Sequence, residues 1–160
     1  MTDIPSLEAD ISKARALAYF TDILTDQVTV LHQVDEALRS VDAALDQAQP
    51  GHSGRIRLMW VARGKSRGWF DERIPQAVAW YRSRAGHWKA VRLPVASLSK
   101  RVKRKGEFEE CVPQVTELVR KLAGLLTLHS EVRGRLARWD GHWSQSRPHV
   151  SRRLDDLRRT

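Results

Sequence analysis

Leucine recurs at every seventh position through the first third of the chain. The two columns of this heptad pattern are Leu17, Leu24, Leu31, Leu38 and Leu45, and then Phe20, Val34, Val41 and Ala48, with Gln27 interrupting the second column. Alternating spacings of three and four residues keep one apolar stripe facing a partner helix, as in a coiled coil. We predict one long acidic helix over residues 6–49, which Pro50-Gly51 ends.

A second heptad pattern lies nearer the C-terminus. Its columns are Val115, Leu122, His129, Leu136 and Trp143, and then Leu118, Leu125, Val132 and Trp139. It predicts a helix over residues 112–141 that has a proline in its first turn and ends at Gly141. Gly124 and Gly134 are candidate sites of close helix approach. On this apolar stripe we expect His129 to be a partnered core residue rather than a metal ligand.

Two apolar stripes of similar length predict an antiparallel helical hairpin. Three arrangements leave the same pattern in a sequence. The stripes can cover each other within the chain, they can form the ordinary buried face of a helical domain, or the Leu17–Leu45 column can bind a second copy or another helical protein. The sequence leaves these alternatives open.

Between the two helices the hydrophobic period changes from 3.5 to 2 residues. Alternation over residues 55–62, 77–84 and 87–93 predicts three short strands, and the Ala85-Gly86 link predicts a hairpin between the last two. Residues 64–75 are predicted to form a loop. The fold class is therefore α+β and mostly α, with two long heptad-patterned helices and a small three-stranded antiparallel sheet inserted between them. We assign residues 1–160 to one domain.

Charge is unevenly distributed along this domain. The basic β insertion, residues 54–106, holds 15 lysines and arginines against two acids, whereas residues 1–51 hold nine acids against three bases. The polar tail, residues 144–160, is rich in arginine and is expected to fray. Charge separated in this way indicates a polyanionic partner for the insertion, while the acidic helix is expected to face away from it.

We predict that the partner is a nucleic acid, with DNA favoured over RNA. Phosphate binding requires cations on one surface, and planar side chains can stack on bases. For any single tryptophan of the insertion the core of a small sheet is the favoured interpretation, whereas for the arginines as a set a functional surface is favoured. The Lys/Arg run at residues 100–105 could also serve as a nuclear import signal or as a lipid-binding patch. The candidate contacts are Arg55, Arg57, Arg63, Lys65, Arg67, Tyr81, Arg82, Arg84, Trp88, Lys89, Arg92, Lys100, Arg101, Lys103, Arg104 and Lys105.

The segment Gly86-His87-Trp88-Lys89-Ala90-Val91-Arg92-Leu93 resembles the glycine-x-tryptophan-x-alanine-x-arginine strand of the arm-type, AP2-like DNA-binding sheets of phage and transposon integrases. The resemblance covers residues 55–93. It implies a three-stranded sheet that is backed by a helix and lies in the major groove. Because the chain contains no recombinase catalytic set, it also implies an accessory protein of a mobile element without strand cleavage. The groove-facing side chains that it implies are Arg57, Arg82, Lys89 and Arg92.

Catalysis is not predicted. The six histidines include no pair at the i, i+4 ligand spacing, and the single cysteine, Cys111, stands beside two glutamates that disfavour a thiolate. We predict no metal and no cofactor. A cytoplasmic protein is expected, because no stretch approaches the roughly 18 apolar residues of a membrane span. The alternative function is a coiled-coil adaptor whose basic head docks an acidic protein partner, and a further alternative is single-strand binding by stacking on Trp88 or Tyr81.

Overall fold

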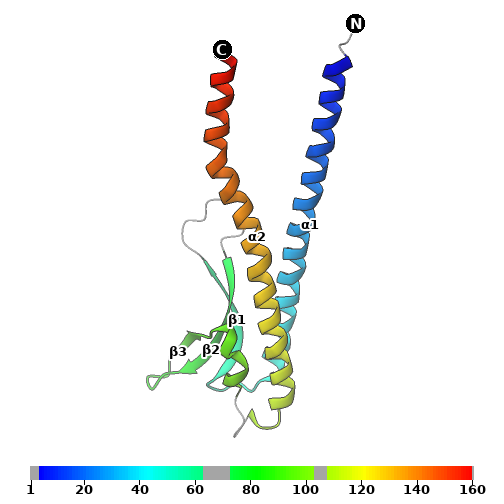
Figure 1. Cartoon of the computed structure of the whole chain (residues 1–160). Coiled ribbons are helices and arrows are strands. Elements are labelled where there is room, and N and C mark those ends of the chain that lie inside the picture. The colour runs from blue at the N-terminus through cyan, green and yellow to red at the C-terminus, as the bar shows by residue number, and fades with distance from the viewer. Residues whose placement is uncertain (1–3, 63–72, 103–107, 160) are drawn as a thin grey trace. The chain divides into compact units, whose positions relative to one another are not determined.

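The computed structural model describes residues 4–62, 73–102 and 108–159. Two long helices, α1 (Ile4–Ala48) and α2 (Val112–Arg159), flank a sheet in the sequence (Figure 1). The strands are β1 (Arg55–Ala62), β2 (Arg73–Arg82) and β3 (Trp88–Arg92), and the 3₁₀ helix η1 (Val95–Arg101) follows them. The predicted fold class, mostly helical with a small antiparallel sheet between the helices, is confirmed.

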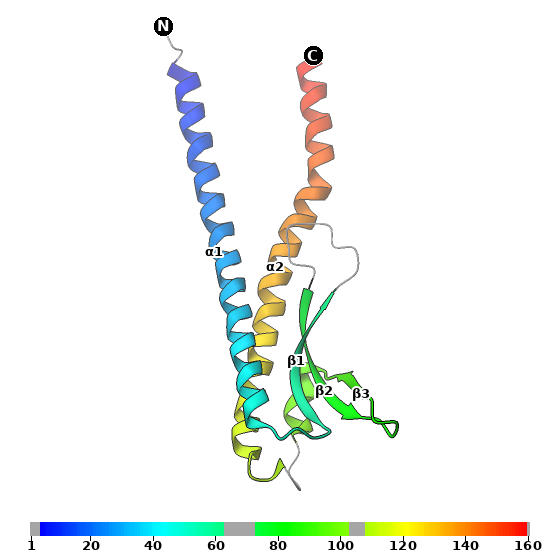
Figure 2. The ribbon, with the colours of Figure 1, turned by 180° about the vertical axis from the view of Figure 1, so that it is seen from behind.

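The sheet is antiparallel, with the strand order β1-β2-β3. In Figure 1, and in the reverse view of Figure 2, β1 is the strand next to the helices and β3 is the outermost. β2 begins at Arg73, inside the segment predicted as a loop, so that the prediction is wrong there. Pro75 pairs with Trp60 of β1 beyond the end of β3. Because β2 has one neighbouring strand at that level, a proline without an N–H is tolerated.

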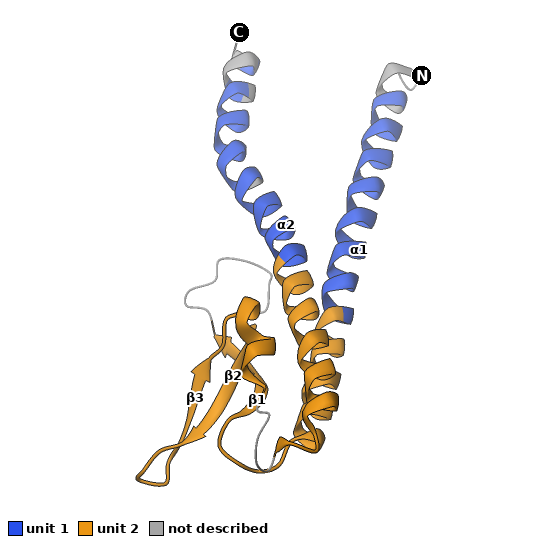
Figure 3. Ribbon diagram, turned by 60° about the horizontal axis from the view of Figure 1, so that its bottom comes forward, with its two compact units in different colours: residues 1–33, 131–160 blue, residues 34–130 orange. Residues whose placement is uncertain are grey.

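The chain divides into two compact units, which Figure 3 distinguishes by colour. Unit 2 consists of residues 34–130 and contains the sheet, η1, the end of α1 and the beginning of α2. Unit 1 consists of residues 1–33 and 131–160, which are the remaining parts of the two helices.

One apolar core holds unit 2 together. Its helical members are fully buried residues of both heptad patterns, such as Leu38, Leu45 and Leu122, and Leu98 of η1 joins them. The sheet contributes Ile56, Leu58, Ala77 and Ala79. Burying each large aliphatic side chain contributes roughly 1.5–3 kcal/mol, so that this cluster accounts for why these helices and strands associate. Within unit 2 the predicted apolar stripes are therefore buried.

A polar group lies within this core. His129 is buried, and its Nε2 lies 3.2 Å from Oδ1 of Asp35 on α1. The Trp60 indole and the imidazole make an edge-to-face contact at 6.3 Å between ring centroids, and the Arg39 guanidinium lies 5.1 Å from the centre of the same indole. The expectation of a partnered core histidine is confirmed.

The free edge of β1 is covered by side chains of α1. The buried Gln49 amide accepts a hydrogen bond from Ile56 N at 2.8 Å and donates to Ile56 O at 2.8 Å and to Leu45 O at 2.9 Å. About two turns earlier, Asp42 Oδ1 accepts a hydrogen bond from Leu58 N at 2.7 Å. An exposed strand edge can pair with other chains, and these two side chains occupy that position.

α2 extends further than the sequence predicts. The helix continues past Gly141 to Arg159 with Pro148 in its interior, so that the predicted end and the predicted frayed tail are both wrong. The first heptad column continues through Val150 and Leu157, and arginine and leucine are strong helix formers. The prediction that another helix approaches closely at the glycines of α2 is also wrong. A Cβ added to Gly124, Gly134 or Gly141 would meet no atom within 4 Å.

Candidate nucleic-acid interface

The register of the sheet separates its side chains into two faces. Ile56 lies opposite Ala79, and Leu58 lies opposite Ala77, on the inner face that packs in the core. The outer face carries the alternating residues of each strand, which are Arg55, Arg57, Met59 and Val61 of β1, Ile74, Gln76, Val78, Trp80 and Arg82 of β2, and Trp88, Ala90 and Arg92 of β3. The outer face is therefore the one that holds most of the strand arginines.

Two of these arginines are already bound to carboxylates of α1. Arg57 donates two hydrogen bonds to Asp42 in a bidentate pair, from Nε to Oδ1 and from Nη2 to Oδ2, each at 2.9 Å. Its Nη1 lies 2.5 Å from Asp46 Oδ1, and Nη2 of Arg55 lies at the same distance from that oxygen. The expectation that the acidic helix faces away from the basic sheet is therefore wrong at this end of α1.

These ion pairs change the availability of both arginines. The hydrogen bond that the Arg57 guanidinium donates to Asp42 raises the pKa of Arg57 above its ordinary value, against an opposing effect of partial burial. The ion pair between Arg57 and Asp42 therefore stabilises the fold in full at any pH below the ordinary pKa of arginine. This stabilisation is lost only when the pH rises through the raised pKa of Arg57. Arg57 therefore stays charged and paired at neutral pH, and both Arg55 and Arg57 have a carboxylate partner within the chain.

The sequence contains a signal for this pairing. Asp42 and Asp46 stand four residues apart on one helix face, and Arg55 and Arg57 stand two apart on one strand face. Only the short segment 49–54 separates the helix from the strand. A carboxylate pair and a guanidinium pair at such close sequence separation indicate an ion-paired helix–strand corner.

The remaining cations gather on the β2–β3 hairpin. Arg82 lies directly opposite Trp88, Lys89 lies opposite Tyr81, and Arg92 lies opposite Val78. Every residue of β3 is exposed, so that Lys89 is accessible although it lies on the other face from Arg92. We call the exposed residues Arg82, Arg84, Trp88, Lys89 and Arg92 the hairpin patch. Within the described part of the chain, no carboxylate forms an ion pair with any of its four cations.

A tight turn presents this patch. Ser83 N donates to His87 O at 2.8 Å and Gly86 N donates to Ser83 O at 2.9 Å, which closes the predicted hairpin. Gly86 has a φ of +82°, a conformation that residues with a Cβ rarely adopt. The Ser83 hydroxyl accepts a further bond from His87 N at 3.1 Å. The turn thus holds Arg82 and Trp88 across from each other.

The aromatic residues of the sheet have different environments. Trp60 and Tyr81 are half-buried and pack against the core, and Trp80 is also half-buried. Trp88 is 45% exposed and belongs to the outermost strand. Of the two side chains proposed for stacking, Trp88 therefore has a face open to a partner, while Tyr81 serves chiefly in packing.

The rest of the predicted site is less well placed. Lys100 and Arg101 are exposed at the end of η1, the helix whose Leu98 enters the core. Six further predicted contacts lie outside the described residues, namely Arg63, Lys65, Arg67, Lys103, Arg104 and Lys105.

The described residues include no group of three or more side chains suited to holding a metal ion. Cys111 is half-buried, and its thiol donates to Phe108 O at 3.2 Å. Neither α1 nor α2, as far as their residues are described, has a segment apolar and long enough to cross a bilayer. No protein-family model matches this chain, and no curated protein or solved structure is similar enough to match it.

Proposed function

We propose that the protein binds nucleic acid, DNA in the first place, through the hairpin patch, and that it acts as a binding factor rather than a catalyst. The observation that supports this most directly is a difference between two groups of arginines. Arg55 and Arg57 are paired with carboxylates, whereas the patch cations have no carboxylate partner among the described residues. Cations left unpaired beside an exposed tryptophan suit a phosphate backbone.

The resemblance to integrase arm-type sheets supports the same proposal. Its implied groove-facing residues include Arg82, Lys89 and Arg92, which belong to the patch, and Arg57, which is bound to Asp42. A three-stranded antiparallel sheet is the architecture that this resemblance implies. On this proposal Arg57 positions β1 against α1, and the outermost strand makes the contacts with the duplex.

A mobility-shift assay with duplex DNA, single-stranded DNA and RNA at several salt concentrations tests the proposal. Neutralising Arg82, Arg84, Lys89 and Arg92 with glutamine should lower the affinity and flatten the plot of log affinity against log salt, by about 0.9 for each duplex phosphate that the variant no longer neutralises. The matched control neutralises four exposed cations outside the sheet, which are Lys13, Arg15, Lys121 and Arg152. Equal reductions in affinity for the two variants, or no retardation of any nucleic acid, would contradict the proposal.

One observation favours the adaptor as a second candidate. The contact between Arg57 and Asp42 shows that an arginine of this sheet can bind a carboxylate carried by a helix. An acidic helix of another protein could occupy the hairpin patch in the same way. Retention of an acidic helical peptide by the patch, together with no retardation of nucleic acid, would establish this function in place of the first.

Single-strand binding makes a separate prediction about Trp88. Stacking of a base on an aromatic side chain contributes about 1–3 kcal/mol, so Trp88→Ala should weaken single-strand binding by about 5- to 150-fold. Trp88→Phe keeps a stacking surface and should restore most of the affinity. Unchanged single-strand affinity in the alanine variant, with the circular dichroism of the wild type, would eliminate this form of the proposal.

A further inference from the structure

The apolar stripe of α1 is buried in unit 2 and becomes exposed toward the N-terminus in unit 1. Leu38 and Leu45 are 0% exposed, whereas Leu17, in the same heptad column, is 68% exposed. Phe20, in the second column, is 46% exposed. Leu24 and Leu31 between them are half-buried, so the coverage of the stripe decreases toward the N-terminus and leaves Leu17 and Phe20 exposed. Large apolar side chains in a continuous exposed stripe are uncommon on a monomer and indicate an interaction surface.

The open part of the stripe is also wider than a helix pair requires. Val28 and Val30 are exposed and flank the central column on its two sides, at the positions next to Gln27 and Leu31. A two-stranded coiled coil uses the two central columns, whereas apolar residues on both flanks indicate a helix that contacts more than one neighbour. The first part of α1 therefore has apolar surface for a second helix besides α2.

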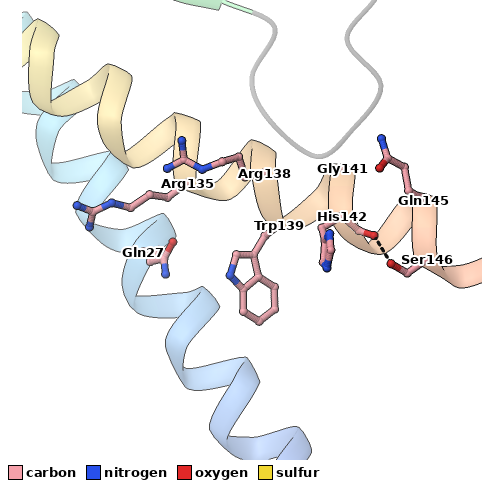
Figure 4. Close-up of a pocket in the computed structure, with 8 residues that line it drawn as sticks. All are labelled: Gln27, Arg135, Arg138, Trp139, Gly141, His142, Gln145 and Ser146. Carbon is pink, nitrogen blue, oxygen red and sulfur yellow. Dashed lines mark hydrogen bonds between the residues drawn. The ribbon is translucent and has the colours of Figure 1, made fainter.

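Within unit 1, α2 supplies a groove beside this stripe. Trp139 makes an edge-to-face contact with Phe20 at 5.8 Å between ring centroids, and it remains 46% exposed. A groove of about 830 Å³ opens around Trp139, bordered by Gln27 of α1 and by Arg135 and His142 of α2 (Figure 4). Trp139 is the large apolar side chain of its lining, and Arg135 and Arg138 make the lining basic. A groove of this kind suits an amphipathic helix whose polar side is acidic.

The chain itself contains such a helix. Residues 1–33 hold five acids and two bases, whereas residues 131–160 hold eight bases and four acids. The two segments of unit 1 are thus opposite in charge, and each carries exposed apolar residues, among them Leu17 and Trp139. In a two-fold symmetric dimer each copy presents the same surface to the other. The contact between the acidic segment of one copy and the basic segment of the other would therefore be made twice.

We propose that unit 1 is a self-association surface, on which a second copy packs its residues 8–31 against the Trp139 groove of the first and receives the same contact in return. The product is a four-helix bundle in which each α1 segment touches two α2 segments. Complementary charge sets which helices become neighbours, and the exposed apolar columns supply most of the affinity. This inference is independent of the proposed nucleic-acid function, because the hairpin patch belongs to unit 2.

Sedimentation equilibrium of the full chain without nucleic acid tests this inference. We expect twice the mass of the 18.3 kDa chain, with dissociation on dilution. Leu17→Glu combined with Val28→Glu places charge in the apolar interface and should weaken the dimer at least about tenfold. The matched control, Ala18→Glu with Thr25→Glu, adds the same charge to the same helix. Ala18 and Thr25 directly follow Leu17 and Leu24 in the sequence and lie on the outer side of the helix, so the control should leave the dimer intact.

All four substituted residues are exposed, so that both variants should fold like the wild type by far-ultraviolet circular dichroism. A chain that sediments as a monomer at every concentration would overturn the inference. So would a dimer that the interface variant and the control weaken equally, because the association would then not involve this stripe.

Discussion

Arg57 and Arg92 lie on the same face of the sheet, on either side of Val78, but only one is bound to a carboxylate. To bind a phosphate, Arg57 must give up a bidentate pair with Asp42, whereas Arg92 exchanges water and counterions. Two arginines in equivalent strand positions therefore differ in what they can contribute to an interface. The difference originates in α1, which carries Asp42 and Asp46 on the helix face beside β1.

This comparison gives a prediction at single residues. Arg92→Gln should lower nucleic-acid affinity and reduce the salt slope by about 0.9, as expected when the protein neutralises one duplex phosphate fewer. Arg57→Gln should leave the salt slope unchanged and lower the stability of the fold instead, because it removes a partner from the half-buried Asp42. Mobility shifts and urea unfolding of both variants measure the two effects. A reduced slope for Arg57→Gln would place that side chain in the interface after all.

Gln49 gives a second prediction. Its amide makes three hydrogen bonds from a buried position, two of them to Ile56 on the free edge of β1. Gln49→Ala leaves the N–H and C=O of Ile56 without these partners, and we expect a decrease of about 1–3 kcal/mol in the free energy of unfolding. Gln47→Ala, at an exposed position of the same turn, should have little effect. Indistinguishable urea midpoints for the two variants would show that the edge of β1 needs no side-chain partner.

At the scale of elements, the change from heptad spacing to alternation was sufficient to predict both helices, the three strands and the hairpin turn. These features depend on local periodicity, which a sequence displays directly. The start of β2 was missed because Pro75 is typical of a loop, and only the absence of a neighbouring strand at that level makes it acceptable. The pairing of Arg57 with Asp42 was missed because it depends on how α1 meets β1, which periodicity does not describe.

The continuation of α2 was missed for a different reason. Gly141 and Pro148 argue against a helix when each is weighed alone, and a Cβ added to Gly141 would meet no atom within 4 Å, as at Gly124 and Gly134 inside the predicted helix. Helix propensity is a weak prior that the neighbouring residues together can override. The glycines of α2 are therefore expected to lower the stability of the helix without ending it.

That view predicts that Gly124→Ala stabilises the protein by about 1 kcal/mol, because alanine favours the helix and an added Cβ meets no atom. Gly86→Ala provides a contrast within the same chain. Its φ of +82° disfavours any residue with a Cβ, so this variant should be less stable than the wild type by about 1–2 kcal/mol. Thermal unfolding of both variants measures the signs. A destabilising Gly124→Ala would mean that this position is packed against a partner that the single chain lacks.

At the scale of the whole molecule, the two units differ in how much apolar surface they bury. Unit 2 contains the core that joins both helices, the sheet and η1, whereas unit 1 leaves Leu17, Phe20 and Trp139 substantially exposed. Local opening is cheapest where few apolar contacts hold an element in place. A long helix that continues beyond its core is stabilised chiefly by packing, so that its outer turns depend on whatever covers them.

Amide hydrogen exchange should therefore separate the units. At low protein concentration, amides of α1 before residue 34 and of α2 after residue 130 should exchange at least about tenfold faster than those of the same helices in unit 2, since fewer apolar contacts oppose their opening. Raising the concentration should slow exchange in unit 1 and leave unit 2 unchanged, because association adds cover to the exposed stripe. Leu17→Glu with Val28→Glu should abolish that concentration dependence. Uniform protection along both helices in dilute solution would show that the stripe in unit 1 needs no second copy to be stable.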